Sequence, residues 1–130
     1  MNIDLSKLIT SDAKFQRAIA DKWESIKASR DAAEFGKFTA LAHVFDGDEQ
    51  SKSRISDAVL MAVLSQSAGQ PFSINWTLAD NSVVALSGAQ MIAVGTALGQ
   101  HVAQTFEKGR ALRTQIKAAQ NHAALNLIAW

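Results

Sequence analysis

The chain has 130 residues, the length of one ordinary domain, and 48% of them are apolar while 19% are charged. This balance favours a packed globule over a disordered segment, and the formal net charge of +1 provides no strong field for nucleic acid or an anionic membrane. The absence of cysteine excludes disulfides, thiolate nucleophiles and cysteine-based zinc sites, and it fits a chain assembled in a reducing cytoplasm.

Neither a signal peptide nor a membrane helix is expected. Met1–Thr10 contains Asp4 and lacks the continuous apolar core of a secretory signal. No acidic residue, lysine or arginine occurs from Asn81 to Phe106, but this stretch carries glutamines, a histidine and three glycines. A spanning helix needs about 20 predominantly apolar residues. We therefore interpret the stretch as a hairpin strand followed by a buried helix.

A first helix is predicted after an N-terminal arm, residues 1–10, that has no clear helical start. The helix should run from about Asp12 to Phe35, with Ser11 or Asp12 as its cap. Gly36 is well placed to end it in the left-handed conformation. One buried stripe is predicted at spacings of four, four and three residues: Phe15, Ile19, Trp23 and Ile26.

A strand and a second helix should follow. The strand is predicted from Lys37 to Phe45 and should end at the turn residues Asp46-Gly47-Asp48. The helix is expected from about Glu49 to Gln66, with Asp48 or Ser51 as its cap. Four apolar residues form its predicted core stripe, which two leucines widen: Ile55, Val59, Ala62 and Val63, with Leu60 and Leu64.

The next segment predicts a hairpin that leads into a long helix. Phe72–Leu78 alternates apolar and polar side chains, Asp80-Asn81 is a turn signal, and Val83–Leu86 should return as the partner strand. Ser87 and Gln90 form a capping-box pair, so the helix should start at Gly88.

No proline or turn cluster interrupts the chain from Gly88 to Trp130, so the pattern predicts one long helix. Gly95 and Gly99 should allow another backbone to approach closely. After Glu107 the helix becomes charged, and it should either protrude or break near Gly109.

Side chains that could carry chemistry are scattered. The histidines His43, His101 and His122 fall on different predicted elements, and no H-E-x-x-H, G-x-S-x-G or P-loop pattern occurs. We therefore expect no catalytic residue, no metal site and no cofactor, and we expect that the protein is not an enzyme. A surface or hydrogen-bonded role is the preferred interpretation for each histidine.

Two charged patterns could suggest ligand binding, but simpler interpretations are preferred for both. Asp46-Gly47-Asp48 is similar to part of a calcium loop, but Lys52 and Arg54 stand where further oxygen ligands would be needed, so we favour a turn and a helix cap. A basic group on the last helix could bind phosphate, but no aromatic platform interleaves it, so a solvated face or an acidic partner is preferred. This group comprises Lys108, Arg110, Arg113 and Lys117.

The C-terminal segment from Ala123 to Trp130 is apolar and follows the body of the domain. Leaving its large side chains in water would forfeit roughly a few kcal/mol, at about 25 cal/mol per Å². Either the segment folds back and buries them, or another chain does, and we favour the second. The predicted partner-binding residues are Leu125, Leu127, Ile128 and Trp130. The predicted organisation is an arm (1–10), an α+β domain (11–118) and an apolar helix end (119–130).

Three segments in order carry a resemblance to a known family. They are Trp23-Glu24-x-Ile26-Lys27-x-x-Arg30-Asp31, then Val44-Phe45-Asp46-x-Asp48-x-x-Ser51 with Ile55, and then Ile74-x-Trp76-Thr77-Leu78-Ala79-Asp80-Asn81 with Val83. Over about Ala20 to Ala118 the chain resembles an uncharacterised domain family of tail proteins in tailed bacteriophages and prophages, whose genes often lie beside tail-fibre and fibre-assembly genes. Ala42 departs from it, since members often carry glycine just before the Phe-Asp turn. The family has no established catalytic residues to transfer.

The expected fold is α+β, in the order α-β-α-β-β-α, with a three-stranded antiparallel sheet packed against helices and a long C-terminal helix. The strand at Lys37–Phe45 should pair with one arm of the later hairpin. The resemblance implies a structural or attachment module of a phage tail that docks to a tail fibre, spike or baseplate protein. It also implies a place in the virion tail, assembly in the host cytoplasm, and a homo-oligomer with a trimer as one option. No nucleic-acid or membrane partner is expected.

Two other functions stay open. One is a tail-fibre assembly chaperone that is absent from the finished particle. The other is a cell-envelope hydrolase, against which the missing catalytic constellation argues.

Overall fold

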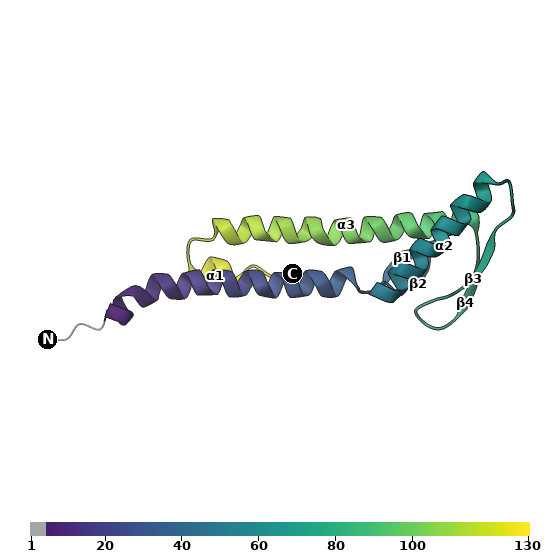
Figure 1. The fold of residues 1–130 in the computed structure, drawn as a ribbon. Helices are drawn as coiled ribbons and strands as arrows, with labels where there is room; N and C mark the ends of the chain where they lie inside the picture. The colour runs from purple at the N-terminus through teal and green to yellow at the C-terminus, as the bar shows by residue number, and fades with distance from the viewer. Residues whose placement is uncertain (1–4) are drawn as a thin grey trace. The chain divides into compact units, whose positions relative to one another are not determined.

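The computed structural model describes the backbone of residues 5–130 and the side chains from residue 10 onward, so residues 1–4 of the predicted arm lie outside the described residues. The α+β class is confirmed (Figure 1). The chain divides into two compact units, which we call the terminal unit (residues up to 31 with 106–130) and the central unit (32–105). The elements are α1 (Leu5–Glu34), β1 (Phe38–Ala40), β2 (His43–Phe45), α2 (Glu49–Ser67), β3 (Ser73–Thr77), β4 (Val83–Ser87), α3 (Gly88–Ala118) and α4 (His122–Asn126).

The terminal unit is helical. It contains α1 up to Asp31, the part of α3 from Phe106 onward, and α4, which lies beside α1 in Figure 1. The predicted stripe on α1 is confirmed, because Phe15, Ile19 and Trp23 pack against buried residues of this unit. α1 begins at Leu5 rather than near Asp12. The buried residues of the terminal unit are Ile26, Leu112, Ile116, Leu125 and Ile128.

The end of α1 differs from the prediction. The helix stops at Glu34, but Gly36 is not in the left-handed region, where Gly69 is the only described glycine. Instead, the carbonyl oxygen of Ala33 at the helix end accepts hydrogen bonds from the Gly36 N–H at 3.2 Å and from His101 Nε2 at 2.7 Å. Glycine is needed at position 47 for space, because a β-carbon there would collide with the carbonyl oxygen of Gly36.

The single strand predicted at Lys37–Phe45 is wrong. β1 and β2 form a tight antiparallel hairpin in which Phe38 faces Phe45 and Ala40 faces His43. The two turn residues, Leu41 and Ala42, have φ angles of 53° and 62°. Two-residue hairpin turns of this kind normally use Asn-Gly or Asp-Gly, because other side chains are strained at positive φ. The sequence therefore carries no turn signal where the chain reverses.

The second helix and the second hairpin agree with prediction. α2 begins at Glu49, and β3 pairs with β4 so that Thr77 faces Val83. In the connecting turn Asn81 has a φ of 67°, and the Asp80 carboxylate accepts a hydrogen bond from the backbone N–H of Ser82 at 2.9 Å.

The capping box at the start of α3 is confirmed in both directions. The Ser87 N–H donates to Gln90 Oε1 at 2.9 Å, and the Gln90 N–H donates to Ser87 Oγ at 3.2 Å. α3 accordingly starts at Gly88, as predicted.

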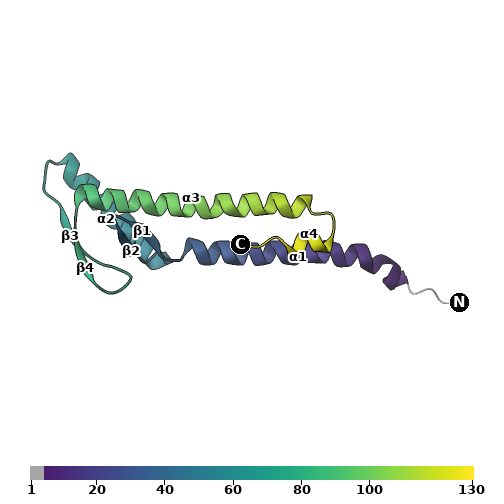
Figure 2. The same ribbon diagram turned by 180° about the vertical axis from the view of Figure 1, so that it is seen from behind.

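The predicted three-stranded sheet is also wrong. The described residues form two separate two-stranded sheets, and both hairpins lie near α2 and the start of α3 (Figure 2). One backbone hydrogen bond links them, from the Ala79 N–H to the Val44 carbonyl oxygen at 3.0 Å. The reversal at Leu41-Ala42 pairs the two three-residue arms of the first hairpin with each other, and neither arm pairs as a strand with the second sheet.

α3 ends at Ala118, so the predicted helix to Trp130 is wrong. Of the two alternatives left open for its charged half, the break near Gly109 does not occur, because the helix continues through this residue. The chain turns after Ala118, and Asn121 starts α4 by accepting a hydrogen bond from the Ala124 N–H at 2.8 Å through its side chain. This reversal returns the last residues of the chain to the terminal unit.

Candidate functional site

The four residues predicted to bind a partner do not form one exposed surface. Leu125 is 1% exposed and Ile128 is 7% exposed, and both lie in the core of the terminal unit. Trp130 packs against this core, with the Lys108 ammonium 4.6 Å from the centre of its ring. Leu127 alone is largely exposed, at 86%. The segment folds back, so the favoured option, burial against another chain, is wrong for Leu125 and Ile128.

Three of the four basic residues predicted on the last helix contact groups of their own unit. Lys108 lies over Trp130, and the Arg113 guanidinium lies over Trp23 at 4.8 Å. Arg110 forms an ion pair with Glu107 at 2.7 Å. Cation–π contacts of this kind stabilise the positive charges without any anionic ligand.

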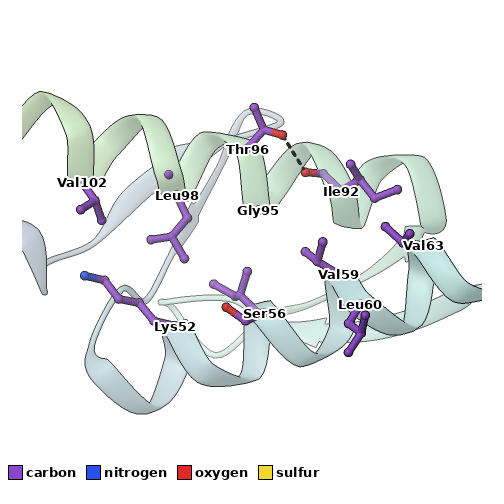
Figure 3. Close-up of a pocket in the computed structure, with 12 residues that line it drawn as sticks. Lys52, Ser56, Val59, Leu60, Val63, Ile92, Gly95, Thr96, Leu98 and Val102 are labelled. Atoms are coloured by element: carbon purple, nitrogen blue, oxygen red, sulfur yellow. Dashed lines mark hydrogen bonds between the residues drawn. The ribbon is translucent and has the colours of Figure 1, made fainter.

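An open apolar groove in the central unit is the most distinctive surface feature of the described chain. α2 forms one wall and the first half of α3 forms the other (Figure 3). The groove encloses about 780 Å³ and presents mainly hydrocarbon. Residues on one face of each helix line it: Lys52, Ile55, Ser56, Val59, Leu60 and Val63 on α2, and Ile92, Gly95, Thr96, Leu98, Gly99 and Val102 on α3.

Two glycines of α3 shape this groove in different ways. A β-carbon at Gly95 would lie 2.7 Å from Cγ2 of Val59, so the absence of a side chain lets the two helices approach here, as predicted. A β-carbon at Gly99 would meet nothing within 4 Å, so the predicted close approach at this second glycine is wrong. The helices therefore pack tightly at Gly95, and beside Gly99 the groove is open.

The outer face of α2 is exposed although it is apolar. Leu60 is 58% exposed, Leu64 is 60% exposed and Met61 is 57% exposed. The prediction that Leu60, Val63 and Leu64 belong to the core is therefore wrong, and the buried residues of α2 are Ile55, Ala58 and Ala62. The core of the central unit covers one narrow face of α2 and leaves the rest in water.

The groove has one charged lining residue, Lys52, and that charge is already paired within the central unit. The Lys52 ammonium lies 3.8 Å from a Glu34 carboxylate oxygen and 4.1 Å from the centre of the Phe35 ring. The only hydroxyl with a described bond in the groove is that of Thr96, which donates to the Ile92 carbonyl of its own helix at 3.1 Å (Figure 3). An occupant would therefore meet apolar walls and no unpaired charge.

The polar residues singled out in the sequence have structural contacts. The pKa of Asp48 lies below its ordinary value because the Ser51 hydroxyl donates to its carboxylate, and a hydrogen bond from the Ser82 side chain lowers the pKa of Asp80 in the same way. Among residues whose side chains are described, no group of three or more His, Asp or Glu could hold a metal ion. No described helix is long and apolar enough to cross a membrane.

Sequence reasoning missed the groove, although α2 contains a signal for it. Leu60, Met61, Val63 and Leu64 stand beside the core positions Ala58 and Ala62, so apolar side chains extend well beyond one helical face. A helix that is apolar around most of its circumference requires contacts on more than one side. Two short hairpins cannot supply contacts on every side.

The chain belongs to the family described as domain of unknown function DUF4376, whose model matches residues 16–129. No curated protein and no solved structure matches the chain.

Proposed function

We propose that the protein is a non-enzymatic structural or attachment module of a phage tail. In this proposal the groove between α2 and α3 receives an amphipathic helix from a tail fibre, spike or baseplate protein. The protein would reside in the virion tail after assembly in the host cytoplasm, as a homo-oligomer for which a trimer is one option. No nucleic-acid or membrane partner is part of the proposal.

The exposed apolar surface of the central unit is the observation that carries the proposal. Leu60, which lines the groove, is 58% exposed, and a β-carbon at Gly99 on the other wall would meet nothing within 4 Å. Contiguous apolar surface on a small protein is typical of an interaction site. The three sequence segments that resemble phage tail proteins supply the setting, and the second and third of them lie within the central unit.

A helix is the occupant that this groove fits best. The α2 wall runs from Lys52 to Val63, about 16 Å at 1.5 Å per residue, which matches three turns of a partner helix. Both walls are helices, so a third helix can place its ridge of side chains between them. Because Lys52 is already paired with Glu34, the side chains of the occupant that face the groove should be apolar.

Substitutions on exposed residues test the groove without disturbing the fold. Leu60→Ser removes apolar surface from one wall, and Gly99→Leu fills the open space beside the other. Val83→Ser is the matched control, since Val83 is 63% exposed on β4 and does not line the groove. We expect cross-linking to the tail fibre, spike or baseplate protein to be lost in the first two variants and kept in the control. Equal cross-linking in all three variants would exclude the groove as the docking site.

Mass spectrometry of purified virions separates the functions that remain open. A tail module should be found in the particle at constant stoichiometry. Its absence, together with binding to newly made fibre chains, would replace the proposal with the assembly chaperone. Turnover of cell-wall substrate that a single polar substitution abolishes would instead establish the hydrolase and contradict a non-enzymatic role.

A further inference from the structure

A second hollow of the central unit is polar, and it collects residues from two of the sequence segments described above. The turn before α2 and the first turns of that helix contribute Asp46, Ser51 and Arg54. β3 and the turn that follows it contribute the other side of the hollow, which has a volume of about 390 Å³. The residues on that side are Ile74, Asn75, Trp76, Thr77 and Asn81.

The side chains around this hollow offer many hydrogen-bonding groups that the chain itself does not use. Asp46 and Arg54 carry opposite charges and line the same hollow, yet the described side chains show no ion pair between them. No described hydrogen bond involves the side chain of Asp46, Arg54 or Asn75. The hollow therefore presents a carboxylate acceptor and a guanidinium donor.

The mixture of groups selects the chemistry of the ligand. A phosphate would be attracted by Arg54 but repelled by the Asp46 carboxylate. A cation would be attracted by Asp46 but repelled by Arg54. A neutral ligand with several hydroxyl groups satisfies both, because each hydroxyl donates one hydrogen bond and accepts others. The half-buried Trp76 and Ile74 add apolar surface, against which the carbon face of such a ligand can pack.

We propose that this hollow binds a carbohydrate. Its volume lies within the range of about 300–1,000 Å³ that is usual for small-molecule sites and suits one or two sugar rings. Asp46 would accept hydrogen bonds from sugar hydroxyls, and Arg54 would donate to them. The groove residues Leu60 and Gly99 do not line this hollow, so the inference does not depend on the proposed function.

Saturation-transfer difference NMR on the full chain tests the inference. The probes are glucose, galactose and N-acetylglucosamine, each presented separately, with inorganic phosphate in a parallel titration followed by protein chemical shifts. We expect transfer from the protein to at least one sugar and no phosphate-dependent shifts at the hollow. Transfer to none of the sugars, or shifts at Arg54 with phosphate alone, would overturn the inference.

Variants locate the signal. Asp46→Ala removes the exposed carboxylate acceptor and should weaken sugar binding about tenfold, while circular dichroism stays unchanged. Arg54→Gln removes the guanidinium group and should also weaken sugar binding, which gives a second, independent test. Leu60→Ser, in the apolar groove, should bind the sugar as the unmodified chain does. If the Asp46 and Arg54 variants bind the sugar as tightly as the unmodified chain does, the sugar contacts another surface.

Discussion

The ammonium group of Lys22 donates a hydrogen bond to the backbone carbonyl oxygen of Ile128 at 2.9 Å, although 106 positions separate the two residues. Lys22 belongs to α1, and Ile128 follows α4, so this bond joins the beginning of the terminal unit to its end. Beside it, Leu125 and Ile128 fill the core of the unit. The apolar end of the chain is therefore an internal component of the terminal unit.

The C-terminal segment should contribute to stability. Leu125→Ala should lower the free energy of unfolding by about 2–5 kcal/mol, the usual cost of emptying a buried leucine site. Leu127→Ala, two positions later but 86% exposed, should change it by less than about 0.5 kcal/mol. Urea denaturation followed by circular dichroism measures both. Equal effects of the two substitutions would contradict the folded-back arrangement.

The two glycines that line the groove should respond in opposite directions to alanine. Gly95→Ala should destabilise the protein by about 1–3 kcal/mol, because the new β-carbon overlaps Val59. Gly99→Ala should stabilise it by about 0.5–1 kcal/mol, since the helix gains a better helix former in open space. Thermal unfolding measures both changes. Adding Val59→Ala should relieve the Gly95→Ala overlap, so the double variant should be more stable than additivity predicts.

The turn of the first hairpin should prefer glycine. Ala42→Gly should stabilise the protein by about 0.5–1 kcal/mol, because a side chain at a φ of 62° is strained and glycine is not. Ala85→Gly is the control: this exposed β4 residue has an ordinary φ, so the same change there should cost roughly 0.5–1 kcal/mol. A loss of stability at position 42 would show that the turn conformation is not strained.

Acid should weaken the protein through its turn carboxylates. The pKa of Asp80 lies below its ordinary value of 3.8 because the Ser82 side chain donates to the carboxylate. As the pH falls, the unfolded chain therefore binds a proton at Asp80 before the folded chain does. The stability that the ionised Asp80 contributes is fully present above about pH 4, and it is lost as the pH falls through the lower pKa of the folded state. Asp80→Asn should show a shallower loss of stability between about pH 4 and pH 2 than the unmodified chain. Chemical denaturation at several pH values measures this slope.

Local signals predicted several elements well. The alternation of Phe72–Leu78, the turn at Asp80-Asn81 and the Ser87–Gln90 capping box all depend on residues close together in the sequence, and the structure has each of them. α2 begins where the Asp46-Gly47-Asp48 turn ends, as its sequence predicts. Such features are predictable because the interactions that stabilise them lie within a few residues.

The failures have a common physical origin in contacts between distant residues. Leu41 and Ala42 are not residue types that favour a two-residue hairpin turn. The reversal there is explained by the pairing of Phe38 with Phe45, which lie outside the turn. Asn121 is a good cap but stands as a single local signal, without a glycine or proline beside it, and the return of the chain also depends on the burial of Leu125. The exposure of α2, and with it the candidate groove, depends on how little of that helix the rest of the central unit covers.

The leucines of α2 also affect how the protein can be handled. With Leu60 and Leu64 exposed, the protein in solution has a hydrophobic surface on α2 that can bind detergent, dyes such as ANS, and unfolded chains of other proteins. Soluble yield should therefore rise when the partner protein that covers this surface is co-expressed. Leu60→Lys should raise the soluble yield in the same way without a partner protein, since a charge within this hydrophobic surface would reduce non-specific association.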